Sequence, residues 1–223
     1  MVALLRHRLS RIAAAFVALF AAWVSPAWAD ASSEAFVKEN LQRALKELSD
    51  PTLSPEQQTE RFGALMDEFA DLPRIAEFVV GRYAGKLRKD PVLYREWRDA
   101  FREYALTVYE GQLDRYRGES AKILSGTQDT TINGRRYSVV PTEITQPNGR
   151  SLTVNWRLIK TDGGWRVVDV ALRAGDNTVW LGIQQRQDFL AVLGKNNGDV
   201  RALIEDVRSR TGVIKRMLAE QRA

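Results

Sequence analysis

The chain has 223 residues, of which 27% are charged and 44% hydrophobic, an ordinary composition for a globular domain that needs no disulfides to hold its core. It contains no cysteine, which excludes thiol nucleophiles, cysteine-ligated zinc, iron–sulfur clusters and a lipid attached to an N-terminal cysteine. The only histidine is His7, so nearly the whole chain lacks the usual general base and the commonest transition-metal ligand.

The first 29 residues read as a cleaved secretory signal peptide. Arg6, His7, Arg8 and Arg11 form a basic start without acidic residues, the apolar run 12–24 follows, and residues 27–29 (A-W-A) fit the small-x-small cleavage rule. An uncleaved anchor is the less favoured alternative, because a bilayer span needs roughly 20 apolar residues. We therefore expect residues 1–29 to be a signal peptide, residues 30–223 to be one domain, and no stable membrane insertion.

Cleavage changes the charge of the working protein. It would leave 30 Lys and Arg against 28 Asp and Glu, a net charge of +2. Nucleic-acid binding needs a much denser basic surface, so no nucleic-acid partner is expected. An exported chain without cysteine favours a bacterial periplasm over a eukaryotic secretory route.

The first half of the mature chain is predicted to be helical. The first helix stops before Asp50-Pro51, the second opens at residues 54–57 (S-P-E-Q), and a short third covers residues 72–82. A long helix starts at Asp90-Pro91 and reaches Gly118. The apolar positions of the first two helices are Ala35, Phe36, Leu41, Ala44, Leu45, Leu48, Phe62, Leu65, Met66 and Phe69; those of the long helix are Leu93, Trp97, Phe101, Tyr104, Ala105, Val108, Tyr109, Leu113 and Tyr116.

The second half begins with strands. Turn signals at 133–134 (N-G), 147–149 (P-N-G) and 162–164 (D-G-G) divide residues 122–173 into four strands of an antiparallel meander. Alternation puts Val168, Val170 and Leu172 on one face of the last strand, and Trp165, Val167 and Ala171 on the other. Helices over 179–193, 200–208 and 213–220 close the chain. The predicted fold is α+β, with helices packed on a four-stranded antiparallel meander sheet.

Catalytic motifs are lacking in the sequence. Residues 81–86 (G-R-Y-A-G-K) are too short for a phosphate-binding loop, and no serine stands in a nucleophile motif. Asp169 could act as a base, with Tyr83, Tyr104 or Tyr109 as a proton donor. The favoured reading is that Asp169 pairs with Arg157 or Arg166 across the sheet.

Apolar side chains are in surplus on both the long helix and the sheet. They either pack on one another as an ordinary core or leave a cavity for an apolar ligand, and periodicity alone favours the ordinary core.

A family resemblance favours the cavity. Several motifs occur in the same order as in one known family. They are residues 69–76 (F-A-D-L-P-R-I-A) and 79–83 (V-V-G-R-Y), the helix 94–109 with 116–118 (Y-R-G), the hairpin 156–170 containing K-T-D-G-G-W and V-x-D-V, and Gln185-Arg186 with Phe189. In this pattern the chain resembles the MlaC-type (toluene-tolerance) periplasmic phospholipid-binding proteins over roughly its whole mature length.

The resemblance implies a periplasmic lipid carrier, not an enzyme, with an apolar pocket between sheet and helices that shields phospholipid acyl chains. It also implies an inner-membrane ABC transporter complex and an outer-membrane lipoprotein complex as partners, and thereby a role in outer-membrane lipid asymmetry. Bound lipid is then cargo, and neither a cofactor nor a metal is expected. The expected pocket residues are Val79, Val80, Tyr83, Trp97, Phe101, Tyr104, Ala105, Val108, Val154, Trp156, Val168, Val170 and Val179.

Two alternatives to this reading stay open. Residues 173–178 (R-A-G-D-N-T) depart from the E-G-[VI]-S-type turn common in the family, and members associated with hopanoid synthesis share the general pattern, so a hopanoid or another polycyclic lipid is an alternative cargo. A small acid/base enzyme would require Asp169 to face the pocket. A polar-solute-binding protein is disfavoured, because such proteins normally have two α/β lobes.

Overall fold

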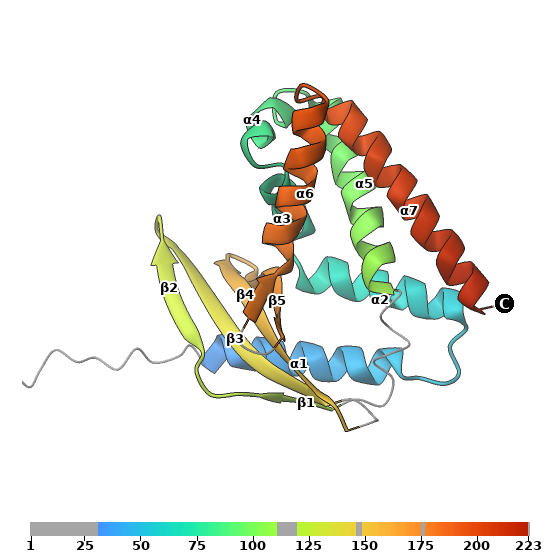
Figure 1. Cartoon of the computed structure of the whole chain (residues 1–223). Helices are drawn as coiled ribbons and strands as arrows, with labels where there is room; N and C mark the ends of the chain where they lie inside the picture. The colour runs from blue at the N-terminus through green and yellow to red at the C-terminus, as the bar shows by residue number, and fades with distance from the viewer. Residues whose placement is uncertain (1–30, 111–119, 146–148, 175–176, 223) are drawn as a thin grey trace, which may run out of the picture.

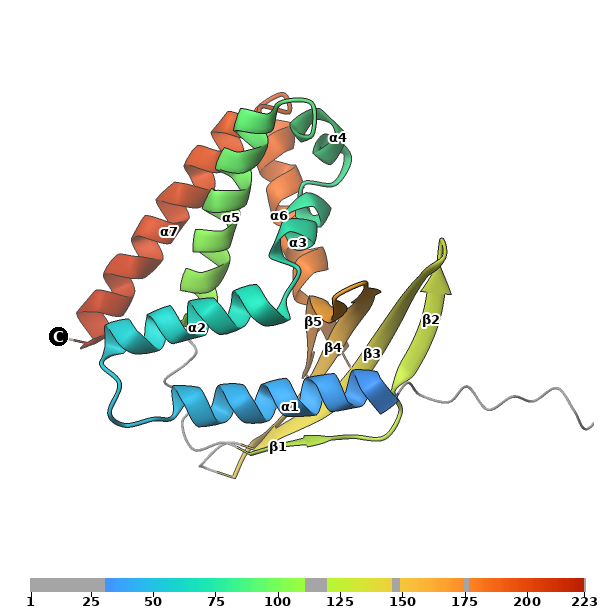
Figure 2. The same ribbon diagram turned by 180° about the vertical axis from the view of Figure 1, so that it is seen from behind.

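Helices make up the first part of the fold in the computed structural model, which describes residues 31–110, 120–145, 149–174 and 177–222. The predicted signal peptide lies outside these residues, as do Leu113, Tyr116 and the expected helix end at Gly118. Helix α1 (Ala31–Leu48) runs antiparallel to α2 (Pro55–Phe69), as both views show (Figures 1 and 2). The predicted start of α2 is confirmed, because Ser54 and Gln57 exchange the two hydrogen bonds of a capping box.

The predicted helix 72–82 is a shorter α-helix, α3 (Leu72–Val79), followed by a 3₁₀ turn, η1 (Gly81–Tyr83). A further short helix, α4 (Ala84–Leu87), lies beyond the predicted range. The physical reason for the shorter α3 is Gly81, whose φ of 55° lies in the left-handed region and ends the α-helix. The long helix α5 (Pro91–Glu110) begins as predicted, since Asp90 accepts hydrogen bonds from the backbone N–H groups of Val92 and Leu93.

The described residues form a sheet of six strands, so the prediction of four strands is wrong in number. The strands are β1 (Ser120–Ile123), β2 (Gln128–Ile132), β3 (Arg135–Thr145), β4 (Ser151–Thr161), β5 (Gly164–Ala174) and β6 (Asn177–Trp180). Strand order is β1-β3-β4-β5-β6, with β2 also paired to β3, and every pairing is antiparallel. The first predicted strand is split near Gly126, whose φ is 102°, so that β1 and β2 pair with opposite halves of β3.

A β-bulge in β5 changes which residues share a face. Arg157 pairs with Asp169, but the next residue, Leu158, pairs with Val167, so Val168 has no partner in the register. Trp165 and Val167 therefore lie on the same face as Val170 and Leu172, and the predicted alternation along this strand is wrong. We call this face, which also carries Val140, Trp156 and Leu158, the α1 face, and the opposite one, which carries Arg157, Asp169 and Ala171, the α6 face.

The C-terminal helices also differ from the prediction. Val179 lies on β6, and α6 (Leu181–Lys195) begins only after it. The two helices predicted at 200–208 and 213–220 are one continuous helix, α7 (Val200–Arg222). Thr211 fits inside this helix because its hydroxyl donates to the carbonyl oxygen of Val207, one turn earlier.

Two hydrophobic cores result from this arrangement. One lies among α3, α4, α5, α6 and α7, which are grouped on one side of α2. The other lies between the sheet and α1 (Figure 1). The predicted α+β class is confirmed. Most helices, however, pack on helices and not on the sheet.

Candidate functional site

The helical members of the predicted pocket lie in the helical core. Val79, Val80 and Trp97 are fully buried there, Phe101 and Ala105 nearly so, and Tyr83 and Tyr104 pack against this core from partly exposed positions. Val108, one turn further along α5, is partly buried. The structure thus brings most of these residues together, but in contact with other helices.

An aromatic cluster fills the centre of that core. Phe189 of α6 lies edge-on to Trp97 and to Phe101, with ring centroids 5.6 and 6.4 Å apart, and its centroid is 5.9 Å from that of Tyr104. The indole N–H of Trp97 donates to the carbonyl oxygen of Ala76 at 2.9 Å. Such edge contacts and a satisfied buried N–H are features of a closed core. The pocket prediction missed Phe189, although the family pattern had singled it out.

The sheet members of the predicted pocket occupy a different place. Val154 is buried and Trp156 partly buried on the α1 face, where α1 packs through Val37 and Phe36. The indole N–H of Trp156 donates to the Thr142 hydroxyl, which in turn donates to the carbonyl oxygen of Val154. The sheet residues and the helix residues therefore belong to two separate clusters.

The other three predicted pocket residues lie on β5 and β6. Val168 sits in the bulge and Val170 beside Trp156, both partly buried. Val179 is 41% exposed on β6, where a helix had been expected.

A further set of apolar side chains is only partly buried. They come from α1, α2, the second half of α5 and the end of the α1 face, and Gly63 of α2 lies close to Leu106 of α5. We call them the apolar band: Leu45, Leu48, Phe62, Met66, Phe69, Leu106, Val108, Tyr109, Ile144, Leu152, Val170 and Leu172. Two of them, Val108 and Val170, are among the predicted pocket residues, and several others stand in the predicted apolar stripes.

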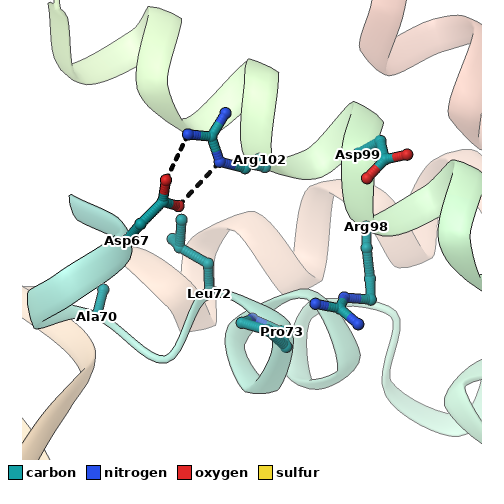
Figure 3. Close-up of a pocket in the computed structure, with 7 residues that line it drawn as sticks. All are labelled: Asp67, Ala70, Leu72, Pro73, Arg98, Asp99 and Arg102. Atoms are coloured by element: carbon teal, nitrogen blue, oxygen red, sulfur yellow. Dashed lines mark hydrogen bonds and ion pairs between the residues drawn. The ribbon is translucent and has the colours of Figure 1, made fainter. Parts of the chain in front are cut away.

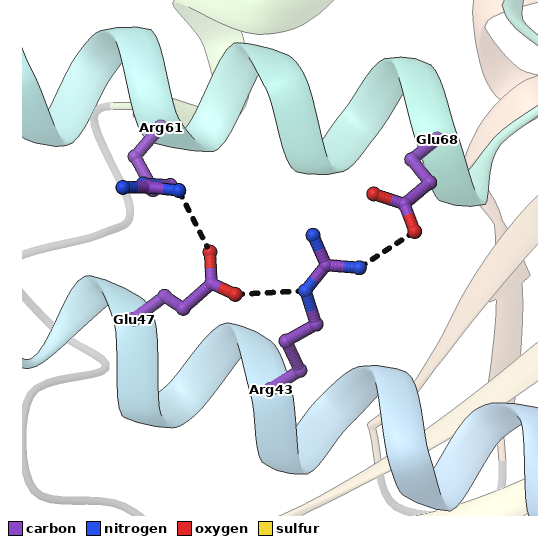
Figure 4. A network of polar contacts seen from close by, with 4 residues as sticks. All are labelled: Arg43, Glu47, Arg61 and Glu68. Carbon is purple, nitrogen blue, oxygen red and sulfur yellow. Dashed lines mark hydrogen bonds and ion pairs between the residues drawn. The ribbon is translucent and has the colours of Figure 1, made fainter.

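A polar network holds α1 against α2 beside this band. Arg43 contacts Glu47 at 2.7 Å and Glu68 at 2.6 Å, and Glu47 lies 3.6 Å from Arg61 (Figure 4). The Arg43 guanidinium also stands 5.4 Å from the centroid of the Phe69 ring. The hydrogen bond from Arg43 holds the pKa of the Glu68 carboxyl below its usual value. These charged side chains, of which Glu47 is partly buried, join the two helices.

The Asp169 carboxylate is engaged by hydrogen bonds and an ion pair within the fold. Its carboxylate accepts hydrogen bonds from the backbone N–H groups of Gly182 at 2.8 Å and Val170 at 2.9 Å, and Arg157 Nη1 lies 3.3 Å away. The predicted pairing with Arg157 is confirmed. Burial raises the pKa of the Asp169 carboxyl, against the opposing effect of these hydrogen bonds and of Arg157. Arg157 itself lies over the Trp180 ring, 3.7 Å from its centroid.

Two cavities formed by the described residues lie elsewhere. One, of about 200 Å³, is bordered by α2, α3 and α5 and contains the bidentate pair of Arg102 with Asp67, with Arg98 and Asp99 on its other side (Figure 3). The second, of about 450 Å³, is an open groove between α3 and the tips of two hairpins. None of the 13 residues predicted for the pocket lines either of these cavities.

The described part of the chain holds neither a metal-ligating cluster nor a membrane-spanning helix. Within it, no group of three His, Asp or Glu side chains could hold a metal ion. None of its helices combines the length and the apolar character that crossing a bilayer requires.

Comparison with known proteins adds a family and a fold. The MlaC protein family matches residues 38–209 of the chain. A phospholipid-binding protein from Ralstonia solanacearum, solved in complex with a phospholipid, shares the fold with a TM-score of 0.68 at 22% sequence identity, over 83% of this chain and 99% of that one. No curated protein matches the sequence.

Proposed function

Because the chain belongs to the MlaC family, we propose that it is a periplasmic carrier that binds a phospholipid and shields its acyl chains from water. The observation that carries this proposal is the family match, which spans about three quarters of the chain. The shared fold with a protein that binds phospholipid supports it.

We place the acyl chains along the apolar band. Its side chains are apolar yet only partly buried, so a lipid tail can cover them without separating packed helices. Of the residues predicted from sequence, the proposal keeps Val108 and Val170, which belong to the band, as lining. Entry of a tail among Trp97, Phe101 and Phe189 would instead require that the closed aromatic cluster be opened.

The physical need for such a carrier follows from the size of the tails. Exposing two acyl chains with about 30 methylenes to water would cost roughly 24 kcal/mol of free energy, at ~0.8 kcal/mol for each methylene. Moving them from a bilayer to an apolar protein site costs little by the same reckoning. The direction of lipid transport must then be set by a partner that hydrolyses ATP. We propose that the protein exchanges lipid with the inner-membrane ABC transporter complex and the outer-membrane lipoprotein complex implied by the family.

Acid/base catalysis by Asp169 is the less supported alternative. Both oxygens of this carboxylate are already engaged, one by the N–H groups that start α6 and continue β5, the other by Arg157. A general base must reach a substrate proton, and this one is turned into the fold.

Native mass spectrometry tests the proposal directly. Protein purified without detergent should carry about one phospholipid per chain, identified after organic extraction. A hopanoid in its place would keep the mechanism and change the cargo. Protein that is folded by circular dichroism but yields no lipid, and takes up none from phospholipid vesicles, would contradict the proposal.

A further inference from the structure

The open groove at the hairpin tips is basic. Its lining comes from α3, the β2–β3 turn, the start of β3, the end of β4 and the β4–β5 turn: Arg74, Gly134, Arg135, Arg136, Ile159, Lys160, Thr161 and Asp162. The lining thus includes four cationic residues and one acidic residue, and outside the lining Asp71 pairs with Arg74 at 2.8 Å. We call this cavity the basic groove.

The cationic side chains are presented to solvent. Arg135, Arg136 and Lys160 are exposed, and Arg136 and Lys160 lie over the Trp165 ring, at 5.9 and 5.0 Å from its centroid. The charged ends of these two side chains therefore lie at the surface against the face of the ring. Positive charge is therefore concentrated around the hairpin tips, with Arg136 and Lys160 beside Trp165 on the α1 face.

An exposed apolar side chain stands at the same place. Ile132, the last residue of β2, is 54% exposed and pairs with Arg135 across the Asn133-Gly134 turn. The β2–β3 hairpin projects away from the helices, at the left of Figure 1 and the right of Figure 2. An apolar tip with arginines directly behind it matches the layering of a membrane surface, where charged headgroups lie outside the apolar interior.

We propose that the basic groove and the β2–β3 tip dock the protein on anionic bilayer surfaces, with Arg135, Arg136 and Lys160 against lipid headgroups and Ile132 in the interfacial layer. Charge complementarity with anionic lipid and the apolar tip together favour a bilayer over an acidic protein, which would not need a projecting isoleucine. The proposal goes beyond cargo binding, because the groove shares no residue with the apolar band.

Vesicle flotation tests this docking with the purified mature protein. It should bind vesicles of equal phosphatidylcholine and phosphatidylglycerol, bind vesicles of phosphatidylcholine alone much less, and lose binding as salt rises. Replacing both Arg135 and Lys160 by serine should weaken binding about 25-fold, at roughly fivefold for each cation near an anionic surface. Ile132→Ser should weaken it at constant charge.

A matched control variant loses two positive charges at a site distant from the basic groove. Arg208 and Arg216 are exposed on α7, on the far side of the molecule from β2, and their joint replacement by serine should leave most of the binding intact. Val170→Trp, designed to displace cargo, should bind vesicles like the unmodified protein, which separates failure of docking from failure of the carrier proposal. The docking proposal would be overturned by equal binding to both vesicle types, or by equal losses in the groove and control variants. Circular dichroism verifies that each variant is folded.

Discussion

Asp169 of β5 accepts a hydrogen bond from the backbone N–H of Gly182, at 2.8 Å, and so ties the first turn of α6 to the sheet. A carboxylate at this position satisfies one of the N–H groups that a helix start leaves without a partner. A Cβ at position 182 would lie 3.0 Å from Asp169 Oδ1, closer than an ordinary contact, so a larger residue there would require the carboxylate to shift.

Two substitutions of Asp169 distinguish the contribution of its hydrogen bonds to stability from that of its charge. Asp169→Asn keeps an oxygen for Gly182 and should change the free energy of unfolding by less than about 1 kcal/mol, whereas Asp169→Ala leaves buried donors unpaired and should cost about 1 to 3 kcal/mol. Chemical denaturation of both variants measures this difference. Bound lipid should be unchanged in Asp169→Asn; loss of lipid there would mean that the carboxylate acts on cargo.

The same group predicts a pH dependence. Because burial raises the pKa of Asp169 in the folded protein above its usual value, the folded state binds the proton more tightly than the unfolded state. The contribution of this group to stability therefore falls as pH rises from the unfolded pKa through the raised folded pKa. Asp169→Asn should remove that dependence, so its stability relative to the unmodified protein should improve across this window. Parallel pH dependences for the two proteins would contradict the assignment.

Filling the apolar band should displace cargo. Val170→Trp adds a large side chain next to Trp156 on the α1 face, and should lower bound phospholipid well below one per chain at a cost of about 1 to 3 kcal/mol in stability. Val92→Trp is the matched control, since Val92 is 60% exposed on the first turn of α5. Native mass spectrometry and thermal melting of both variants decide the matter. Full lipid occupancy in Val170→Trp would place the tails elsewhere.

Phe189 tests whether tails enter the helical core. Phe189→Ala removes a fully buried ring that contacts Trp97, Phe101 and Tyr104, and should cost about 3 to 5 kcal/mol. Phe78→Ala, at a 36% exposed position, should cost much less. Lipid content of the folded fraction should stay the same in both. A lower lipid content in Phe189→Ala, with stability nearly unchanged, would instead make this ring part of the lipid site.

Export should remove the first 29 residues. The intact mass of protein from the periplasmic fraction should correspond to a chain that begins at Asp30. A mass that retains residues 1–29 would contradict both the cleavage site and the mature net charge of +2. The cytoplasmic fraction of the same cells serves as the control for unprocessed chain.

Local sequence patterns predicted much of the chain correctly. The capping box at Ser54, the start of α5 at Asp90 and the Asn133-Gly134 turn each depend on atoms within a few residues, so the sequence determines them directly. The same holds for the apolar stripes of α1, α2 and α5 and for the order of motifs that indicated the family. The ion pair of Asp169 with Arg157 could be expected because charged groups on buried strands need partners.

Only the tertiary structure decided which surfaces meet. Periodicity shows that one face of α5 is apolar, but Phe189 could be placed against it only once α6 was in position, and so the expected contact of α5 with the sheet became a helix–helix core. The bulge at Val168 likewise depends on pairing between strands, since it exists only as a mismatch between β4 and β5. Side chains alternate between the two faces of a strand, so one extra residue moves all those before it to the opposite face. The bulge therefore put Trp165 and Val167 on the face opposite to the predicted one. The apolar band escaped prediction for the same reason: partial burial is a property of several elements packed together, and no single stretch of sequence contains it.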